Sequence, residues 1–151
     1  MILIGSDKYF RQLKNHNHWE WLFLSEKHIY NTDMMMTTTT AMNTVMSFIK
    51  HLNEEDFDAA RKCVDDDLKF EGVMGSRDGA DVYFEDMKKM KLKYHVLKTF
   101  ADGDDVCLMY DINMSGIIIF SCGWYKVEHN KITSFRVVFD PRPLLHQSVK
   151  K

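Results

Sequence analysis

The feature that most constrains the fold of this chain is a change, near Lys91, in the spacing of its apolar residues. Before this point apolar side chains recur at helical spacing, whereas after it they form strand-like segments. The segments cover residues 94–101, 106–114, 117–127 and 132–140. Short polar or glycine-containing turns separate them, and Ser115-Gly116 is a standard hairpin signal. The second half of the chain therefore predicts an antiparallel sheet, which Pro141 and Pro143 bring to an end.

Three helices are expected before the sheet. Thr39 or Thr40 can cap the first, and Asp78 can cap the third. The second helix is short and ends at the acidic run of residues 65–67, after which residues 68–73 form a short strand. The apolar faces consist of Ala41, Val45, Phe48, Ile49 and Leu52, then Phe57, Ala60 and Val64, then Tyr83, Met87 and Met90. The predicted fold class is α+β, with three N-terminal helices packed on the sheet.

The composition is that of a soluble globular protein, with 45% hydrophobic and 28% charged residues among 151. The 20 basic and 22 acidic residues are scattered along the chain, which argues against a nucleic-acid-binding surface. No segment approaches the length of a membrane span. Cys63, Cys107 and Cys122 lack metal-type spacing and fit a reducing compartment. We therefore expect a cytoplasmic protein with no metal and no cofactor.

The N-terminal part differs from the rest and ends in Met34-Met35-Met36, which four threonines follow. It is either a helical extension or an upstream addition to a chain whose translation starts in the methionine run. The expected organisation is an extension over residues 1–36, a domain over residues 37–145 and a tail over residues 146–151.

One segment of the expected sheet, residues 117–120, is apolar without alternation. A strand that is apolar on both faces must be covered on both, and the helices can cover only one of them. The outer face, with Ile118, Phe120, Cys122 and Trp124, is therefore a candidate homodimer surface. The alternative is that the N-terminal extension covers it.

Three parts of the chain resemble elements of one known superfamily. Residues 48–57 resemble its first helix and the turn into the second. Residues 70–75 with 77–79 resemble its first strand and the glycine before the third helix, and residues 131–140 resemble its closing strand with a final Asp. The superfamily is the nuclear transport factor 2-like group, which includes ketosteroid isomerases, SnoaL-like polyketide cyclases and limonene-epoxide hydrolase. The resemblance covers about residues 40–145 and implies a strongly curved, cone-like sheet around a pocket.

The implied pocket lies between the helices and the concave sheet face and suits a small hydrophobic molecule. The alternative is that side chains fill the cone completely. The residues implied to line it are Phe48 from the first helix and Tyr94, Trp124, Tyr125, Phe135, Val137 and Phe139 from the sheet.

By the same resemblance, Glu71 occupies the place of the general base in ketosteroid isomerases. A carboxylate enclosed by apolar walls holds its proton more tightly, which suits proton transfer. Such a base needs donors that stabilise the enolate it creates. Where the isomerases keep those donors, this chain has Phe48 and Gly123, so isomerase chemistry of that type is not expected. The alternative for Glu71 is a strand position that faces solvent.

Asp111 and Asp140 resemble the two carboxylates of the Asp-Arg-Asp set in limonene-epoxide hydrolase, where they activate water and protonate the epoxide. Met109 stands in the place of the arginine. Strict alternation puts Asp140 on the face opposite Phe139, unless a bulge precedes Pro141. Alternatively, Asp140 forms a structural turn with Arg142.

Two functions follow as expectations: a dimeric module that binds a hydrophobic small molecule, or an acid–base enzyme, such as an isomerase, cyclase, dehydratase or hydrolase, that acts on one. A protein-interaction module is a third, weaker option. A fold of this kind hosts many activities, so the resemblance implies the architecture more strongly than the chemistry.

Overall fold

The computed structural model describes residues 18–148, with side chains for residues 33–145. Residues Met1–Met36 and Thr37–Lys151 form two compact units. Helix α2 runs from His18 to Glu54. The prediction that a helix starts at Thr39 or Thr40 is therefore wrong. Threonine continues the helix here because its hydroxyl can bond the preceding turn, as Thr44 Oγ1 does when it donates to the Thr40 carbonyl at 3.0 Å. Residues 1–17 of the predicted extension lie outside the described residues.

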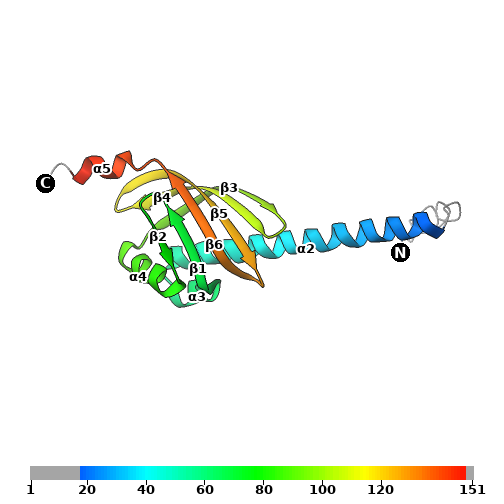
Figure 1. The fold of residues 1–151 in the computed structure, drawn as a ribbon. Helices are drawn as coiled ribbons and strands as arrows, with labels where there is room; N and C mark the ends of the chain where they lie inside the picture. The colour runs from blue at the N-terminus through cyan, green and yellow to red at the C-terminus, as the bar shows by residue number, and fades with distance from the viewer. Residues whose placement is uncertain (1–17, 149–151) are drawn as a thin grey trace, which may run out of the picture. The chain divides into compact units, whose positions relative to one another are not determined.

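The remaining elements follow in an α+β order (Figure 1). The predicted sheet segments of the second half correspond to β3–β6, and the α+β fold class is confirmed. The elements are α3 (Phe57–Lys62), β1 (Val64–Gly72), β2 (Gly75–Asp78), α4 (Ala80–Met90), β3 (Lys93–Asp102), β4 (Asp105–Met114), β5 (Ile117–Glu128), β6 (Lys131–Phe139) and α5 (Arg142–Ser148).

The six strands form one sheet in the order β2-β1-β6-β5-β4-β3. Strands β3 to β6 pair antiparallel as predicted, but β1 pairs parallel with β6, so the sheet is mixed. The prediction of a purely antiparallel sheet is wrong at this point. The parallel pair joins strands that are far apart in the chain, a partnership that local turn signals do not encode.

The prediction that the second helix ends at the acidic run of residues 65–67 is wrong, because these residues lie inside β1. Val64 and Leu68 are buried while Asp66 and Asp67 face solvent, and the register against β6 shifts between Val64 and Lys69. Asp78 likewise ends β2 rather than capping a helix, because the residue before α4 is Gly79, which makes no side-chain cap.

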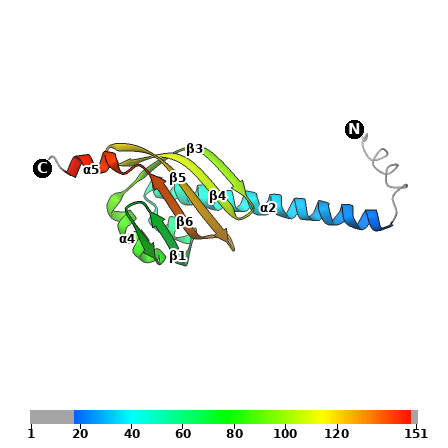
Figure 2. The same cartoon turned by 45° about the horizontal axis from the view of Figure 1, so that its top comes forward.

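Helix α4 and the C-terminal part of α2 lie on one face of the curved sheet, whereas α5 lies beyond its end (Figures 1 and 2). Asn53 near the end of α2 holds strand β3 in place. Its Nδ2 donates to the Tyr94 carbonyl at 2.8 Å, and its Oδ1 accepts from the Tyr94 amide at 2.7 Å. The buried core lies between these layers and includes Val45, Phe48 and Leu52 of α2. None of the helices within residues 18–148 combines the length and apolar character needed to cross a membrane.

Candidate functional site

A cavity of about 430 Å³ lies between the concave sheet face and helices α2 and α4. Its walls are mainly apolar. A cavity of this volume is not compatible with a cone that side chains fill completely. The lining residues are Phe48, Phe70, Gly72, Met74, Gly75, Arg77, Tyr83, Asp86, Met87, Lys89, Met90, Leu92, Tyr94, Tyr110, Ile112, Met114, Tyr125, Phe135, Val137, Phe139 and Leu144.

Most of the predicted lining residues are at this cavity. Phe48, Tyr94, Tyr125, Phe135, Val137 and Phe139 line it. Trp124 does not: it is 53% exposed, lies on the outer face of β5 and donates from Nε1 to Asp105 Oδ1 at 2.7 Å. Adjacent strand residues point to opposite faces, so Tyr125 and Trp124 could not both face the cavity.

Phe135 on β6 is the centre of the aromatic wall. Its ring stacks on Tyr125 with centroids 5.1 Å apart and an interplanar angle of 15°. It meets the ring of Tyr83 edge-on at 5.3 Å, and Phe70 at 4.9 Å. Phe48 from α2 packs against it at 5.9 Å. Such contacts fix the ring positions, so the wall is a rigid surface rather than a loose set of side chains.

Four tyrosines from four different elements also line the cavity: Tyr83 on α4, Tyr94 on β3, Tyr110 on β4 and Tyr125 on β5. Burial raises the pKa of each hydroxyl above its ordinary value of 10.0. They are therefore neutral hydrogen-bonding groups at physiological pH. Tyr83 and Tyr110 were not among the predicted site residues, although the alternation of Leu108, Tyr110 and Ile112 on β4 is a sequence signal that places Tyr110 inward.

Tyr125 occupies the space that a side chain on Gly123 would need. A Cβ atom at Gly123 would lie 2.8 Å from Cε2 and 3.0 Å from Oη of Tyr125. The position at which the isomerases keep a second acid is thus filled here by a phenol from two residues further along the same strand.

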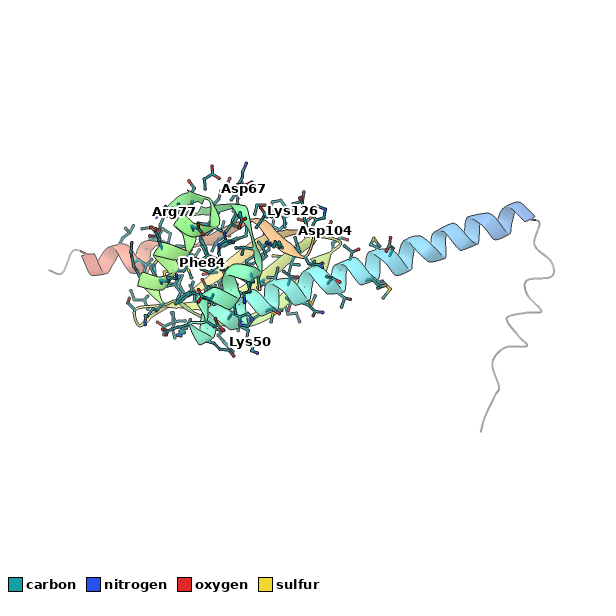
Figure 3. All side chains as sticks on the ribbon, turned by 90° about the horizontal axis from the view of Figure 1, so that it is seen from below. Lys50, Asp67, Arg77, Phe84, Asp104 and Lys126 are labelled. Carbon is teal, nitrogen blue, oxygen red and sulfur yellow. The ribbon has the colours of Figure 1, made fainter. Side chains whose placement is uncertain are left out.

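Three charged residues belong to the lining: Arg77, Asp86 and Lys89. Arg77 of β2 donates from Nε to Asp86 Oδ2 at 2.6 Å, and both side chains are partly exposed. Lys89 is exposed near the end of α4. Arg77 lies toward one end of the domain and Lys126 and Asp104 toward the other (Figure 3). The lining also includes the last residues of α4, β4 and β6, which are Met90, Met114 and Phe139.

The three predicted catalytic carboxylates do not meet, and none belongs to the lining. Glu71 is exposed and pairs with Arg136, whose Nε donates to Glu71 Oε2 at 2.6 Å. Asp111 lies on the outward-facing positions of β4, between the buried Tyr110 and Ile112. The residue before Asp111 on β4, Tyr110, faces inward and lines the cavity in its place.

Asp140 follows β6 and accepts hydrogen bonds from Arg142, with Nε at 2.8 Å and Nη2 at 2.5 Å. These side-chain bonds, with one from the Arg142 amide, lower the pKa of Asp140 to about 2. This is the geometry of the structural turn given above as the alternative. Among residues 33–145, no three His, Cys, Asp or Glu side chains cluster as metal ligands.

Comparisons with known proteins identify the family to which this domain belongs. Residues 39–150 match the model of the limonene-1,2-epoxide hydrolase catalytic domain. The chain belongs to the limonene-1,2-epoxide hydrolase family. The wider nuclear transport factor 2-like resemblance is confirmed by a crystal structure of an NTF2-like protein of unknown function from Cytophaga hutchinsonii. It is 50% identical with a TM-score of 0.69, over 70% of this chain and 94% of that one.

Other solved structures are more distant. A protein from Kribbella flavida is 26% identical, with a TM-score of 0.68 over 74% of this chain and 95% of that one. A limonene-1,2-epoxide hydrolase-like (LEH-like) epoxide hydrolase from M. tuberculosis is 24% identical, with a TM-score of 0.61 over 76% and 98%. No protein of curated function matches the chain. In this limonene-1,2-epoxide hydrolase family member, the cavity is lined mainly by phenols and apolar groups, and Glu71, Asp111 and Asp140 do not belong to the lining.

Proposed function

We propose that this domain binds a small, mainly apolar molecule in the cavity between α2, α4 and the concave face of the sheet. The observation that carries the proposal is the cavity itself, with a volume of about 430 Å³ and aromatic walls. Ligand pockets commonly occupy about 300–1,000 Å³ and combine apolar walls with a few polar groups. The fixed aromatic rings and the four neutral phenols match that description.

Two neighbouring valines on β6 allow a matched test. Val137 lines the cavity, whereas Val138 is 53% exposed on the opposite face of the same strand. Val137→Phe adds a ring to the cavity and should weaken binding of an apolar ligand by roughly tenfold or more. Val138→Phe adds the same atoms outside and should leave binding unchanged. A thermal-shift screen of lipophilic metabolites identifies a ligand, and calorimetry then measures its Kd for the three proteins. Equal Kd values would refute the proposal.

Epoxide hydrolysis is the second candidate, and the family match favours it. It requires a base that activates water beside the bound epoxide. The carboxylates of Asp111 and Asp140 lie outside the lining, so the binding proposal fits the geometry better. If the protein converts an epoxide to a diol and Asp140→Asn abolishes this activity, the result would favour the enzyme.

We also propose that a second copy of the chain covers the outer sheet face. Large apolar side chains are exposed there, with Ile118 at 68% and Phe120 at 57%. Trp124 on the same strand and Val138 on the neighbouring strand β6 lie on the same face. Patches of this kind mark interaction sites, and closed two-fold dimers are the commonest assembly of a soluble chain.

We propose a cytoplasmic location from the three cysteines of the chain. Cys63, Cys107 and Cys122 are all free, although the Sγ atoms of Cys107 and Cys122 are only 3.4 Å apart. Three cysteines, an odd number without metal-type spacing, fit a reducing compartment better than a disulfide framework.

A further inference from the structure

Three sulfur-containing side chains lie together on the outer face of the sheet, where β4 runs beside β5. Cys107 and Met109 occupy successive outward positions of β4, and Cys122 occupies an outward position of β5. Met109 is directly opposite Cys122 in the strand register, so Cys107 is the diagonal neighbour of Cys122. The Sγ atoms of the two cysteines are 3.4 Å apart, and both thiols are free. We call Cys107, Met109 and Cys122 the sulfur triad.

The strand register suits an atom held between the two thiols better than a direct bond between them. Diagonal neighbours on antiparallel strands have Cα atoms about 7–8 Å apart, whereas cysteines joined by a disulfide usually lie about 4.4–6.8 Å apart. A metal with bonds of about 2.3 Å to two sulfur atoms holds those atoms roughly 4 Å apart. The Sγ atoms of Cys107 and Cys122 are already 3.4 Å apart, and a small rotation of the side chains supplies the rest.

We infer that the sulfur triad binds a soft monovalent metal ion, Cu(I), through the thiolates of Cys107 and Cys122 and the thioether of Met109. Thiolate and thioether sulfur favour Cu(I), whereas structural zinc almost always takes four ligands. The two cysteines are 15 residues apart in the chain, which is no metal-binding spacing, and only the pairing of β4 with β5 assembles the triad. This site is separate from the cavity and goes beyond the function proposed for it.

The side chains around the triad are mainly apolar. Phe100 of β3 and Trp124 of β5 lie opposite Cys107 on its two neighbouring strands, and Val138 of β6 lies opposite Cys122. An apolar shell of this kind limits the access of water to a metal site.

The charges near the triad also suit this ion. Cu(I) with two thiolates carries a net negative charge, and Lys98 of β3, directly opposite Met109, places a positive charge on the same face. Burial raises the pKa of the Cys107 thiol to about 11. The thiol therefore keeps its proton until a metal displaces it, as happens when metals bind cysteine.

Competition with bicinchoninate, a coloured Cu(I) chelator, measures the Kd of the reduced full-length protein in the absence of oxygen. The wild type should retain one equivalent of Cu(I). Cys107→Ser and Cys122→Ser should each weaken binding by roughly 100-fold or more, because changes behind the metal ligands already cost about 10–100-fold. Met109→Leu should weaken binding by about tenfold, since it removes only the thioether.

Matched controls exist for both kinds of ligand. Cys63→Ser removes a thiol at the end of α3, outside the triad. Met46→Leu removes a thioether from α2 that is 37% exposed, against 36% for Met109. Both controls should bind Cu(I) as the wild type does. Met109→Leu changes an exposed side chain conservatively, so it tests the site even if a serine variant fails to fold.

The triad lies in the face that we propose a second copy covers, so the measurements are repeated in Ile118→Lys, where this face is open. Cu(I) binding in either background that is lost with Cys107 or Cys122 would support the site. Absence of binding in both backgrounds, or binding that survives both cysteine substitutions, would overturn it. Equal Kd values for Met109→Leu and Met46→Leu would overturn the role of the thioether.

Discussion

At the residue scale, Glu55 shows how a single partly exposed carboxylate links two distant parts of this domain. It follows the end of α2 with a positive φ of 58°. Its Oε2 lies 2.9 Å from Lys91 Nζ and its Oε1 lies 2.9 Å from Lys93 Nζ. Lys93 Nζ also donates to the Asn53 carbonyl at 2.7 Å. The end of α2 is thereby tied to the segment that leads into β3, where Tyr94 begins the cavity wall.

We expect these ion pairs to make the stability of the fold depend on pH. The hydrogen bonds from Lys93 and Lys91 lower the pKa of Glu55 from 4.5 to about 2. A carboxyl with a lowered pKa in the folded state stabilises the fold above its unfolded pKa, and this contribution is lost as the pH falls through the folded pKa. Glu55→Gln should therefore lower Tm slightly at pH 7, and its Tm should approach that of the wild type between pH 4.5 and pH 2.

Glu54→Gln is the matched control for this pH series. Glu54 is the neighbouring residue, and its contacts are looser: Oε1 lies 3.9 Å from Lys50 Nζ and Oε2 lies 3.7 Å from His51 Nδ1. Removing the same charge there should change the Tm profile less. If both variants follow the same profile, the links from Glu55 to Lys91 and Lys93 do not contribute to stability.

At the element scale, the hairpin between β4 and β5 depends on the backbone of its two turn residues. Ser115 has φ of 54° and Gly116 has φ of 92°. Positive φ at both positions defines the two-residue turn whose twist matches the flanking strands, for which Asn-Gly is preferred. A Cβ atom on Gly116 would meet nothing within 4 Å, so an alanine there is opposed by the backbone alone.

Gly116→Ala should therefore destabilise the domain by about 1–2 kcal/mol, the cost of a left-handed conformation for a residue with a Cβ. Ser115→Asn should have the opposite sign, with a small gain. Chemical denaturation of both variants beside the wild type measures the two free energies of unfolding. A loss in both variants would mean that side-chain contacts, rather than φ, decide the turn.

Some strands of the sheet could be predicted from the sequence, and the pairing of others could not. Strands β3 to β6 follow from alternation and adjacent turn residues, which are local signals. The parallel pairing of β1 with β6 depends on which distant strand buries Val64 and Leu68, and nothing near β1 in the chain records it. At the site, Phe135 and Val137 followed from their positions on one strand face. Trp124 lies on the opposite strand face from Tyr125, as alternation along β5 requires, so only one of the two lines the cavity. The packing of the Tyr125 ring beside Gly123 exists only in three dimensions.

At the scale of the whole molecule, the curved sheet presents two apolar faces with different coverings. The concave face is covered by α2, α3 and α4 and contains the cavity, so its exposed surface is small. The outer face carries Ile118, Phe120, Trp124 and Val138 with more than half of each side chain exposed. Exposing so much apolar surface is unfavourable in water, which favours association through this face.

A charge placed in that face tests the proposed dimer. Ile118→Lys puts an ammonium group at the most exposed apolar position of the face, so each protomer of a two-fold dimer would bury a charge with no partner. Light scattering after size exclusion should give twice the chain mass for the wild type and the chain mass for the variant. Val82→Lys, which changes a 49% exposed valine on α4, should remain dimeric. A monomeric wild type would disprove the dimer. If the wild type is a dimer that Ile118→Lys does not disturb but removal of residues 1–36 does, the association depends on the N-terminal unit rather than on the sheet.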